Sequence, residues 1–230
     1  MTRLPALLPL LLATACGTMN TARPLDPGEH AVGLTFGGPI VDVNDSWLPL
    51  PNAVLEGRTG LNPVASRATD VNYGLNLTGI AFGLAGLHGG VSHTLGLQDG
   101  YRPHVSVSNR LFLYNNYPDG RKAADAKGFW VLDQLEVTAS WALGHQLVYS
   151  GLAEYLDLGA PGLLLAPFAG VELGGSGRVR TQLELRHMAA NRVQDVNTIR
   201  WLNPGTGALQ ITVGLHVKLG QPRTATPEAK

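Results

Sequence analysis

Two segments near the C-terminal end of the chain alternate between apolar and polar side chains at every second residue. In residues 178–187, Val179 and Leu183 belong to the apolar face and Glu184 to the charged face, and residues 209–219 follow the same rule. A period of two indicates an extended strand, because successive side chains of a strand point to opposite sides of the sheet. About ten residues is the length that a tilted strand needs to cross a bilayer. If the apolar face meets lipid, the charged face must line a closed interior.

The composition of the chain is typical of a transmembrane β-barrel and argues against several other classes. Only 15% of the residues are charged, the mean hydropathy is +0.05, and 29 glycines favour strands and turns over helices. A barrel has this muted hydropathy because half of its strand residues face inward. No stretch after Leu12 is apolar for the roughly 18 residues of a membrane helix. Basic and acidic residues balance at 17 each, which indicates neither a nucleic-acid partner nor an acidic one.

Segments with strand character recur at regular spacing between residues 30 and 219. The candidate strands are 30–37, 52–61, 69–77, 87–95, 103–114, 130–142, 146–156, 163–173, 178–187 and 209–219. Connections after odd-numbered strands, such as 38–51 and 115–129, are mostly longer than those after even-numbered strands, such as 143–145. Long loops at one end and short turns at the other are typical of a spanning barrel. The sequence predicts an all-β fold, a single antiparallel transmembrane β-barrel over residues 30–219, with about ten strands and a range of about eight to twelve.

The apolar stretch of residues 79–87 does not alternate. It fits either a short helix or a strand with apolar neighbours on both sides. The sequence leaves both alternatives open.

Residues 1–15 have the features of a secretion signal. Arg3 is followed by an apolar stretch rich in leucine and then by three small residues. The only cysteine comes next, and Ala13-Thr14-Ala15-Cys16 resembles the bacterial lipobox, in which the cysteine is acylated and becomes the first mature residue. Ala13 stands where that motif usually has leucine, and the same residues also fit an ordinary cleavage site. Export is expected either way, with residues 16–29 as a periplasmic linker, residues 220–230 as a disordered polar tail, and no disulfide.

The charged faces of the predicted strands supply a candidate site inside the barrel. The interior of a barrel of this size is narrow and filled by side chains, so opposite charges must pair there to offset the cost of burial. The charges expected to form this network are Glu56, Arg58, Arg110, Glu136, Glu172, Arg178, Arg180, Glu184 and Arg186. A plug of ion pairs is the favoured interpretation, and a narrow pore for small solutes or a ligand cavity is the alternative.

Aromatic residues close to the predicted long loops are expected at the outer membrane–water interface, where amphipathic rings are favoured. These residues are Trp47, Tyr114, Tyr117, Phe129, Trp130, Tyr155 and Trp201.

One run near the last long loop resembles an enzyme family. Residues 186–191, followed by Asn203-Pro204-Gly205, resemble the outer-membrane lipid A deacylases, which have a His-x-Ser-Asn run late in the barrel near an Asn-Pro-Gly turn. The resemblance implies a general-base role for His187. It departs from the family at Ala189, which occupies the nucleophile position without a hydroxyl, and at Asn191, which is one residue out of place.

The omptin proteases are a second family with ten strands, and they place Asp and His residues in their outer loops. A set of this kind would use Asp42, Asp45, Asp125, Asp195 and His187, although no motif fixes it. The other histidines are scattered without metal-ligand spacing, and no nucleotide-binding or hydrolase fingerprint occurs. Neither a metal nor a cofactor is therefore predicted.

These observations predict an outer-membrane β-barrel with a lipid anchor at Cys16 and with outer-membrane lipid as its partner. Its expected role is structural or surface interaction, and an enzymatic role is not favoured. A barrel hydrolase is one alternative. A soluble exported β-sandwich or lipocalin-like binder, whose apolar faces would form a core, is another.

Overall fold

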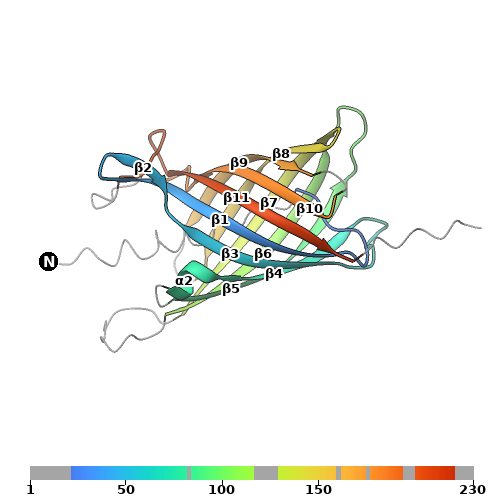
Figure 1. Ribbon diagram of the computed structural model, residues 1–230, viewed down its shortest axis with the longest axis horizontal. Coiled ribbons are helices and arrows are strands. Elements are labelled where there is room, and N and C mark those ends of the chain that lie inside the picture. Colours follow the sequence, from blue (N-terminus) through green and yellow to red (C-terminus); the bar gives the residue numbers. More distant parts are fainter. Residues whose placement is uncertain are drawn as a thin grey trace, which may run out of the picture.

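Eleven antiparallel strands form a single sheet, and ten of them close into a barrel (Figure 1). The computed structural model describes residues 22–81, 84–116, 129–158, 162–174, 177–193 and 200–220. The strands are β1 (His30–Val43), β2 (Ser46–Pro49), β3 (Asn52–Gly60), β4 (Thr69–Asn76), β5 (Leu84–Gly96), β6 (His104–Asn116), β7 (Phe129–Leu143), β8 (Gln146–Asp157), β9 (Leu163–Leu173), β10 (Val179–Met188) and β11 (Ala208–Leu219). The barrel closes because β11 pairs with β1, from His30 opposite Leu219 to Pro39 opposite Gln210. The prediction of an all-β antiparallel barrel of about ten strands is confirmed.

The two ends of the barrel differ in their connections. At one end the strands are joined across residues 61–68, 97–103, 144–145 and 174–178, and at the other across 77–83, 117–128, 158–162 and 189–207. We call the first the short-turn end and the second the long-loop end. β1 begins and β11 finishes at the short-turn end. The two longest connections of the barrel both lie at the long-loop end, as the spacing of the strands in the sequence predicted.

The long-loop end includes a hairpin where the sequence predicted a loop. β1 continues to Val43 and turns into β2 through Asn44 and Asp45, which both have positive φ. Asn and Asp tolerate this conformation better than most residues, so they favour a tight hairpin turn. The extension of β1 also has a packing reason, because Val41 is buried against Trp201. The first strand is therefore longer than predicted.

The apolar stretch 79–87 contains both of the structures that its sequence allowed. The short helix α2 (Leu77–Ala81) follows β4, and β5 begins at Leu84. The side-chain oxygen of Asn76 accepts a hydrogen bond from the backbone N–H of Gly79 at 2.7 Å, which caps the start of this helix. Across the ranges that the structure describes, no helix is long and apolar enough to span a membrane.

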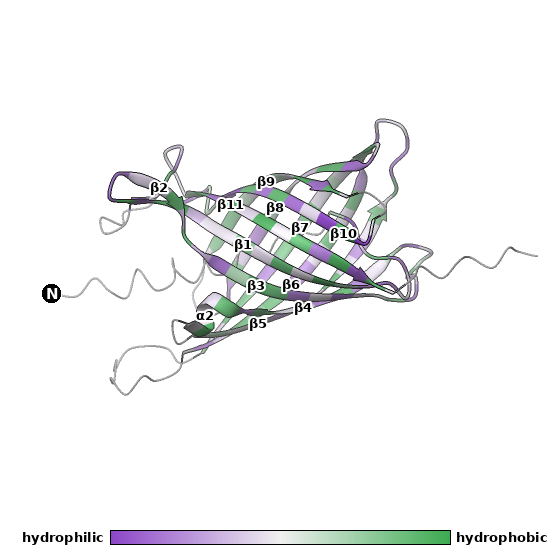
Figure 2. Ribbon diagram, viewed as in Figure 1, coloured by the Kyte–Doolittle hydropathy of each residue, from purple (hydrophilic) through white to green (hydrophobic). Residues whose placement is uncertain are grey.

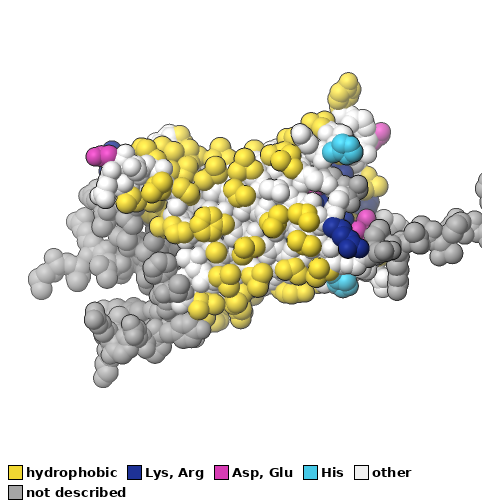
Figure 3. Space-filling model, viewed as in Figure 1, with side chains coloured by type: hydrophobic (Ala, Val, Ile, Leu, Met, Phe, Trp, Pro, Cys, Tyr) yellow, Lys and Arg dark blue, Asp and Glu magenta, His cyan; other side chains and the backbone are white. Residues whose placement is uncertain are grey.

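Side chains on the barrel wall are apolar outside and polar inside. Hydrophobic and hydrophilic residues alternate along the strands (Figure 2). Leu183, Val213 and Leu215 are 45%, 49% and 47% exposed, whereas Glu184 and Gln210 are each 1% exposed. Figure 3 shows apolar side chains spread over this side of the wall, with charged side chains gathered towards its two ends. A water-soluble β-sandwich would bury its apolar faces instead. The alternation predicted from the sequence therefore has the polarity expected of a barrel in lipid.

Large inward rings lie over glycines of the neighbouring strand. Each ring stands directly opposite its glycine, in the pairs His216–Gly33, His88–Gly74, Tyr114–Gly86, Phe168–Gly151 and Tyr149–Gly170. A Cβ atom at any of these glycines would overlap the ring. The glycines thus let five large rings lie flat against the interior wall, which fills a narrow barrel without pushing its strands apart.

Three aromatic residues expected at the membrane interface lie elsewhere. Tyr114 and Tyr155 are 1% and 2% exposed inside the barrel, because their positions in β6 and β8 fix their side chains inward. Trp201 is buried against Val41 at the long-loop end. Of the others, Trp47 and Phe129 are exposed, Trp130 is half-buried, and Tyr117 lies outside the described residues.

Candidate functional site: the charged interior of the barrel

Six of the nine charges predicted to line the interior are buried there: Glu56 and Arg58 of β3, Arg110 of β6, Glu136 of β7, and Glu184 and Arg186 of β10. Glu172 and Arg180 form an ion pair of 2.8 Å near the short-turn end, where both side chains are partly exposed. Arg178 precedes β10 at the short-turn end and is exposed.

Arg186 is the centre of one buried cluster. Its Nε donates a hydrogen bond to Oε1 of Glu184 at 3.0 Å, and its Nη2 lies 3.2 Å from Oε2 of Glu136. Its Nη1 donates to the hydroxyl of Tyr155, and its guanidinium carbon lies 4.8 Å from the centre of the Phe168 ring. We call these five residues the Arg186 cluster. The side chains of Arg186 and Glu136 are 0% exposed, so Arg186 pairs with the carboxylates of Glu136 and Glu184 away from water.

Neutral side chains complete the hydrogen bonding of the two carboxylates. Glu136 accepts a hydrogen bond from Nε2 of Gln134 at 2.9 Å. Glu184 accepts one from the hydroxyl of Tyr149 at 3.2 Å, and that hydroxyl accepts one from Nε2 of Gln182 at 2.6 Å. A buried ion pair is tolerated when its remaining polar atoms also find partners. The Arg186 cluster therefore joins β7, β8, β9 and β10 through the interior.

A second cluster lies on the wall formed by β3, β4, β5 and β6. Arg58 pairs with Asp70, and both side chains are buried. Oε1 of Glu56 lies 3.6 Å from Nε2 of His88, and Arg110 of β6 is buried on the same wall, opposite Gly90 of β5. We call these five residues the Arg58 cluster.

The sequence did not identify several members of this interior network, among them Asp70, His88 and Tyr149. Asp70 and His88 are buried, and Tyr149 is 0% exposed. Asp70 alternates in phase with Asn72, another buried polar residue of β4, so side-chain parity was the available signal for it. His88 lies on the glycine-rich β5, where the sequence offers little alternation to read.

The charges of the two clusters nearly balance. Arg58, Arg110 and Arg186 are buried together with the carboxylates of Glu56, Asp70, Glu136 and Glu184. Channels that select ions commonly line their path with rings of like charge. Opposite charges in direct contact instead link the strands that supply them, so this arrangement is suited to holding the barrel closed.

The run that resembles the lipid A deacylases occupies the long-loop end of β10. Nε2 of His187 donates to the backbone carbonyl of Thr206 at 2.8 Å, and the Thr206 hydroxyl donates to the carbonyl of Ala190 at 2.8 Å. Ala189 has a positive φ of 52° and is buried. Asn191 holds the start of β9, since its side chain bonds the N–H of Leu165 at 2.9 Å and the carbonyl of Leu163 at 2.9 Å. These residues thus make structural contacts between β9, β10 and the connection that follows.

The residues of the omptin-like set do not converge in the described part of the chain. Asp42 forms an ion pair of 2.9 Å with Arg200, and Asp45 is exposed at the tip of the β1–β2 hairpin. Asp125 and Asp195 lie outside the described residues. In the ranges given above, no group of three or more His, Cys, Asp or Glu residues could hold a metal ion.

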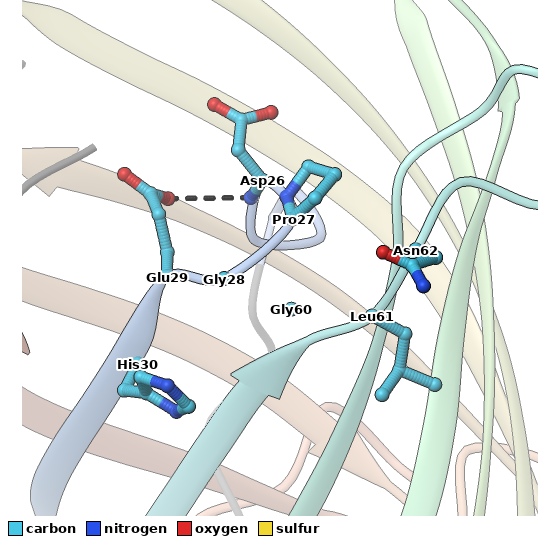
Figure 4. A pocket seen from close by; sticks show the side chains of 8 residues that line it. All are labelled: Asp26, Pro27, Gly28, Glu29, His30, Gly60, Leu61 and Asn62. Atoms are coloured by element: carbon cyan, nitrogen blue, oxygen red, sulfur yellow. Dashed lines mark hydrogen bonds between the residues drawn. The ribbon is translucent and has the colours of Figure 1, made fainter. Parts of the chain in front are cut away.

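Residues 22–29, part of the segment expected to be a linker, lie against the short-turn end of the barrel. Figure 4 shows a pocket between the turn at residues 26–29 and the end of β3, with the Glu29 side chain accepting a hydrogen bond from the backbone of Asp26 at 3.2 Å. Glu29 also forms an ion pair of 2.8 Å with Lys218 of β11. Cys16, the expected lipid anchor, lies outside the described residues.

Comparison with known proteins gives no assignment, because no family model matches the chain and no curated protein matches it.

Proposed function

We propose that this protein is an outer-membrane β-barrel with a structural or surface-interaction role and an interior plugged by charged side chains. The observation that supports this most directly is the polarity of the barrel wall. Leucine and valine side chains half exposed on the outside surround an interior in which charged side chains are almost fully buried. In water the apolar outer face would stay exposed, so the fold would gain little from the hydrophobic effect and would still bear the cost of burying charge. In lipid the same outer face is stabilised.

The dimensions of the strands support a spanning barrel. The strands that form the barrel contain between 8 and 15 residues. A tilted spanning strand needs about 9–11 residues, so most of these strands are long enough to cross the hydrocarbon region. Because β1 pairs with β11, the sheet has no open edge over the paired residues. A bilayer requires this, since unpaired backbone N–H and C=O groups have no hydrogen-bonding partner in lipid.

The contacts inside the barrel support a structural role over transport. The Arg58 cluster lies on β3 to β6 and the Arg186 cluster on the adjoining strands β7 to β10, so together they line most of the interior wall. Large rings over glycines take up further space between them. A barrel filled in this way is a rigid membrane anchor for the connections at its long-loop end. Those connections can then meet a partner at the cell surface. A lipid anchor at Cys16 would add a second attachment.

Two measurements on the full-length protein test this proposal. Membrane fractionation should place the protein with outer membranes, and unheated samples should migrate faster on a gel than boiled ones, because a closed barrel stays compact in detergent. Planar-bilayer recording of the purified protein should give no steady conductance. A protein that stays soluble without detergent would overturn the membrane proposal, and a stable open channel would overturn the plugged interior.

A further inference from the structure

Residues 22–29 cross the short-turn mouth of the barrel, and we call them the strap. The strap is buried at two apolar positions, since Ala22 is 0% exposed and Leu25 is 4% exposed. The carbonyl of Ala22 accepts a hydrogen bond from the hydroxyl of Ser106 at 3.5 Å. Ser106 is an inward residue of β6, so the strap reaches inside the mouth.

Arg23 connects opposite parts of the mouth. Its Nε donates to the hydroxyl of Ser140 in β7 at 3.1 Å, and its Nη2 donates to Oε1 of Gln98 at 2.7 Å. Its own carbonyl accepts a hydrogen bond from Nη2 of Arg58 in β3 at 3.0 Å. One residue of the strap thus bridges the β3 wall and the β7 wall.

The remainder of the strap is tied to β3, β4 and β11. The backbone N–H of Leu25 donates to Asp70 at 2.8 Å, so the strap shares a carboxylate with the Arg58 cluster. The N–H of Gly60 donates to the carbonyl of Glu29 at 2.8 Å. Glu29 then closes the strap onto β11 through its ion pair with Lys218.

The strap is held more weakly than the barrel that it closes. Among the residues described, its buried apolar side chains are those of Ala22 and Leu25, and its other contacts are single hydrogen bonds and one ion pair. The barrel strands, in contrast, are joined by continuous ladders such as the twelve pairs between β7 and β8. Segments with few apolar contacts open at a lower free energy than the ladders around them.

We propose that the strap is a displaceable closure of the short-turn mouth, which undocks while the barrel stays folded and then admits solvent to the Arg58 cluster. This goes beyond the proposed function, because a permanently plugged barrel needs no separate closure at one mouth. The strap shields Ser106 and Ser140, and its hydrogen bonds occupy groups of the Arg58 cluster. Undocking would therefore expose inward residues that the intact protein hides.

Gly60 offers a way to displace the strap without touching its sequence. Gly60 has no left-handed φ, so alanine fits its backbone, but the added Cβ would overlap the backbone carbonyl of Asp26 in the strap. Gly89→Ala is the matched control, because the nearest atom to its added Cβ is 3.9 Å away. Arg23→Ala is an independent change, which removes the side-chain hydrogen bonds to Ser140 and Gln98 and so breaks the bridge on the β7 side.

The test measures how fast single introduced cysteines react with a charged, membrane-impermeant maleimide in the full-length protein, folded in detergent. Ser106→Cys reports on the mouth under the strap. Thr212→Cys reports on the barrel itself, since Thr212 is buried and pairs with Gly37, far along β1 from the strap. Mass spectrometry of the peptides separates either reporter from Cys16.

We expect Ser106→Cys to react slowly when the strap is intact. Gly60→Ala and Arg23→Ala should each accelerate the reaction by at least about tenfold, while Gly89→Ala leaves it unchanged and Thr212→Cys stays protected in every background. Fast labelling of Ser106→Cys with the strap intact would overturn the proposal. Unchanged protection in both strap variants would also overturn it. Equal acceleration at both reporters would show that the barrel loosens as a whole, which likewise contradicts a separate closure.

Discussion

Replacing Arg186 by methionine should destabilise the barrel more than any other single arginine substitution inside it. Arg186 makes an ion pair with Glu184 at 2.9 Å and one with Glu136 at 3.2 Å, donates to Tyr155, and packs over the ring of Phe168. Methionine keeps much of the packing but leaves two carboxylates buried without their cation. Removing one partner of a buried pair costs about 3–5 kcal/mol, so we expect a loss in this range or above it.

Arg180→Met is the matched control, because Arg180 lies on the same strand with the same inward parity. Its side chain is 25% exposed, and that of its partner Glu172 is 13% exposed. Solvent reaches this pair, so its loss should cost less than that of a fully buried pair and lie closer to the value of about 0–1 kcal/mol for exposed ion pairs. The two substitutions therefore remove the same chemical group from one strand, with expected costs that differ several-fold.

A third variant separates lost charge balance from lost packing. Combining Arg186→Met with Glu136→Gln and Glu184→Gln leaves the cluster neutral and keeps hydrogen-bonding side chains in place. Neutral groups of similar shape are much cheaper to bury than unpaired charges, so this variant should regain most of the lost stability.

The assay is equilibrium urea unfolding of the refolded barrel in detergent micelles. Tryptophan fluorescence and heat-modifiable gel migration give two independent readings of the folded fraction, and linear extrapolation gives the free energy of unfolding. The reasoning is refuted if Arg186→Met costs no more than Arg180→Met. It is also refuted if the neutral triple variant is as unstable as Arg186→Met alone.

Three further predictions concern other parts of the chain. Gly170→Ala should destabilise the barrel by about 1–3 kcal/mol in the same urea assay, because its Cβ would overlap the ring of Tyr149. Burial on its own raises the pKa of Glu29, but the hydrogen bonds and charge of Lys218 outweigh it and hold this pKa below its ordinary value of 4.5. The pair therefore stabilises the docked strap above that value, and its contribution is lost as the pH falls through the lowered pKa. The strap should then protect Ser106→Cys from maleimide less well in acid. Glu29→Gln should remove this acid-dependent step. Intact-mass measurement should find the mature chain beginning at an acylated Cys16, and an unmodified mature N-terminus would exclude the anchor.

Side-chain parity was the most reliable information in the sequence. β10 and β11 alternate cleanly, and Leu183 and Leu215 indeed lie outside while Glu184 lies inside. The reason is physical: both faces of a barrel strand meet uniform surroundings, so the period of two is not blurred by mixed contacts.

Some aromatic residues were misplaced because their distance from a loop was given more weight than their side-chain direction within the strand. Tyr114 was placed at the rim because a long loop follows it, yet its parity matches that of Arg110 and Phe112, which also point inward. Tyr155 was misplaced in the same way. Direction within a strand decides where a side chain goes, and distance from a loop does not override it.

The sequence could not show which buried side chains pair with each other inside the barrel. Arg186 and Glu136 are separated by 50 residues and come from strands that are not neighbours in the sheet. Which carboxylate meets which arginine depends on the register of every intervening pair. The pairing of large rings with glycines depends on register in the same way, because each ring is opposite its glycine only in the folded sheet.

The strap was missed for a different reason. Residues 22–29 include three charged residues together with Pro24, Pro27 and Gly28, a composition typical of linkers. Their docking depends on groups such as Ser140 and Asp70, which the barrel brings to its mouth only once it has closed. No local pattern in the segment indicates those partners.

Depth-resolved fluorescence quenching along β10 tests the central claim most directly. An environment-sensitive probe would be attached to single cysteines at Gln182, Leu183, Glu184 and Leu185 of the protein in vesicles, with brominated or spin-labelled acyl chains as the quencher. The account predicts strong quenching from lipid at Leu183 and Leu185 and little at Gln182 and Glu184, a period of two along one strand. Equal exposure of Leu183 and Leu185 to aqueous iodide, with no quenching from the acyl chains, would contradict it.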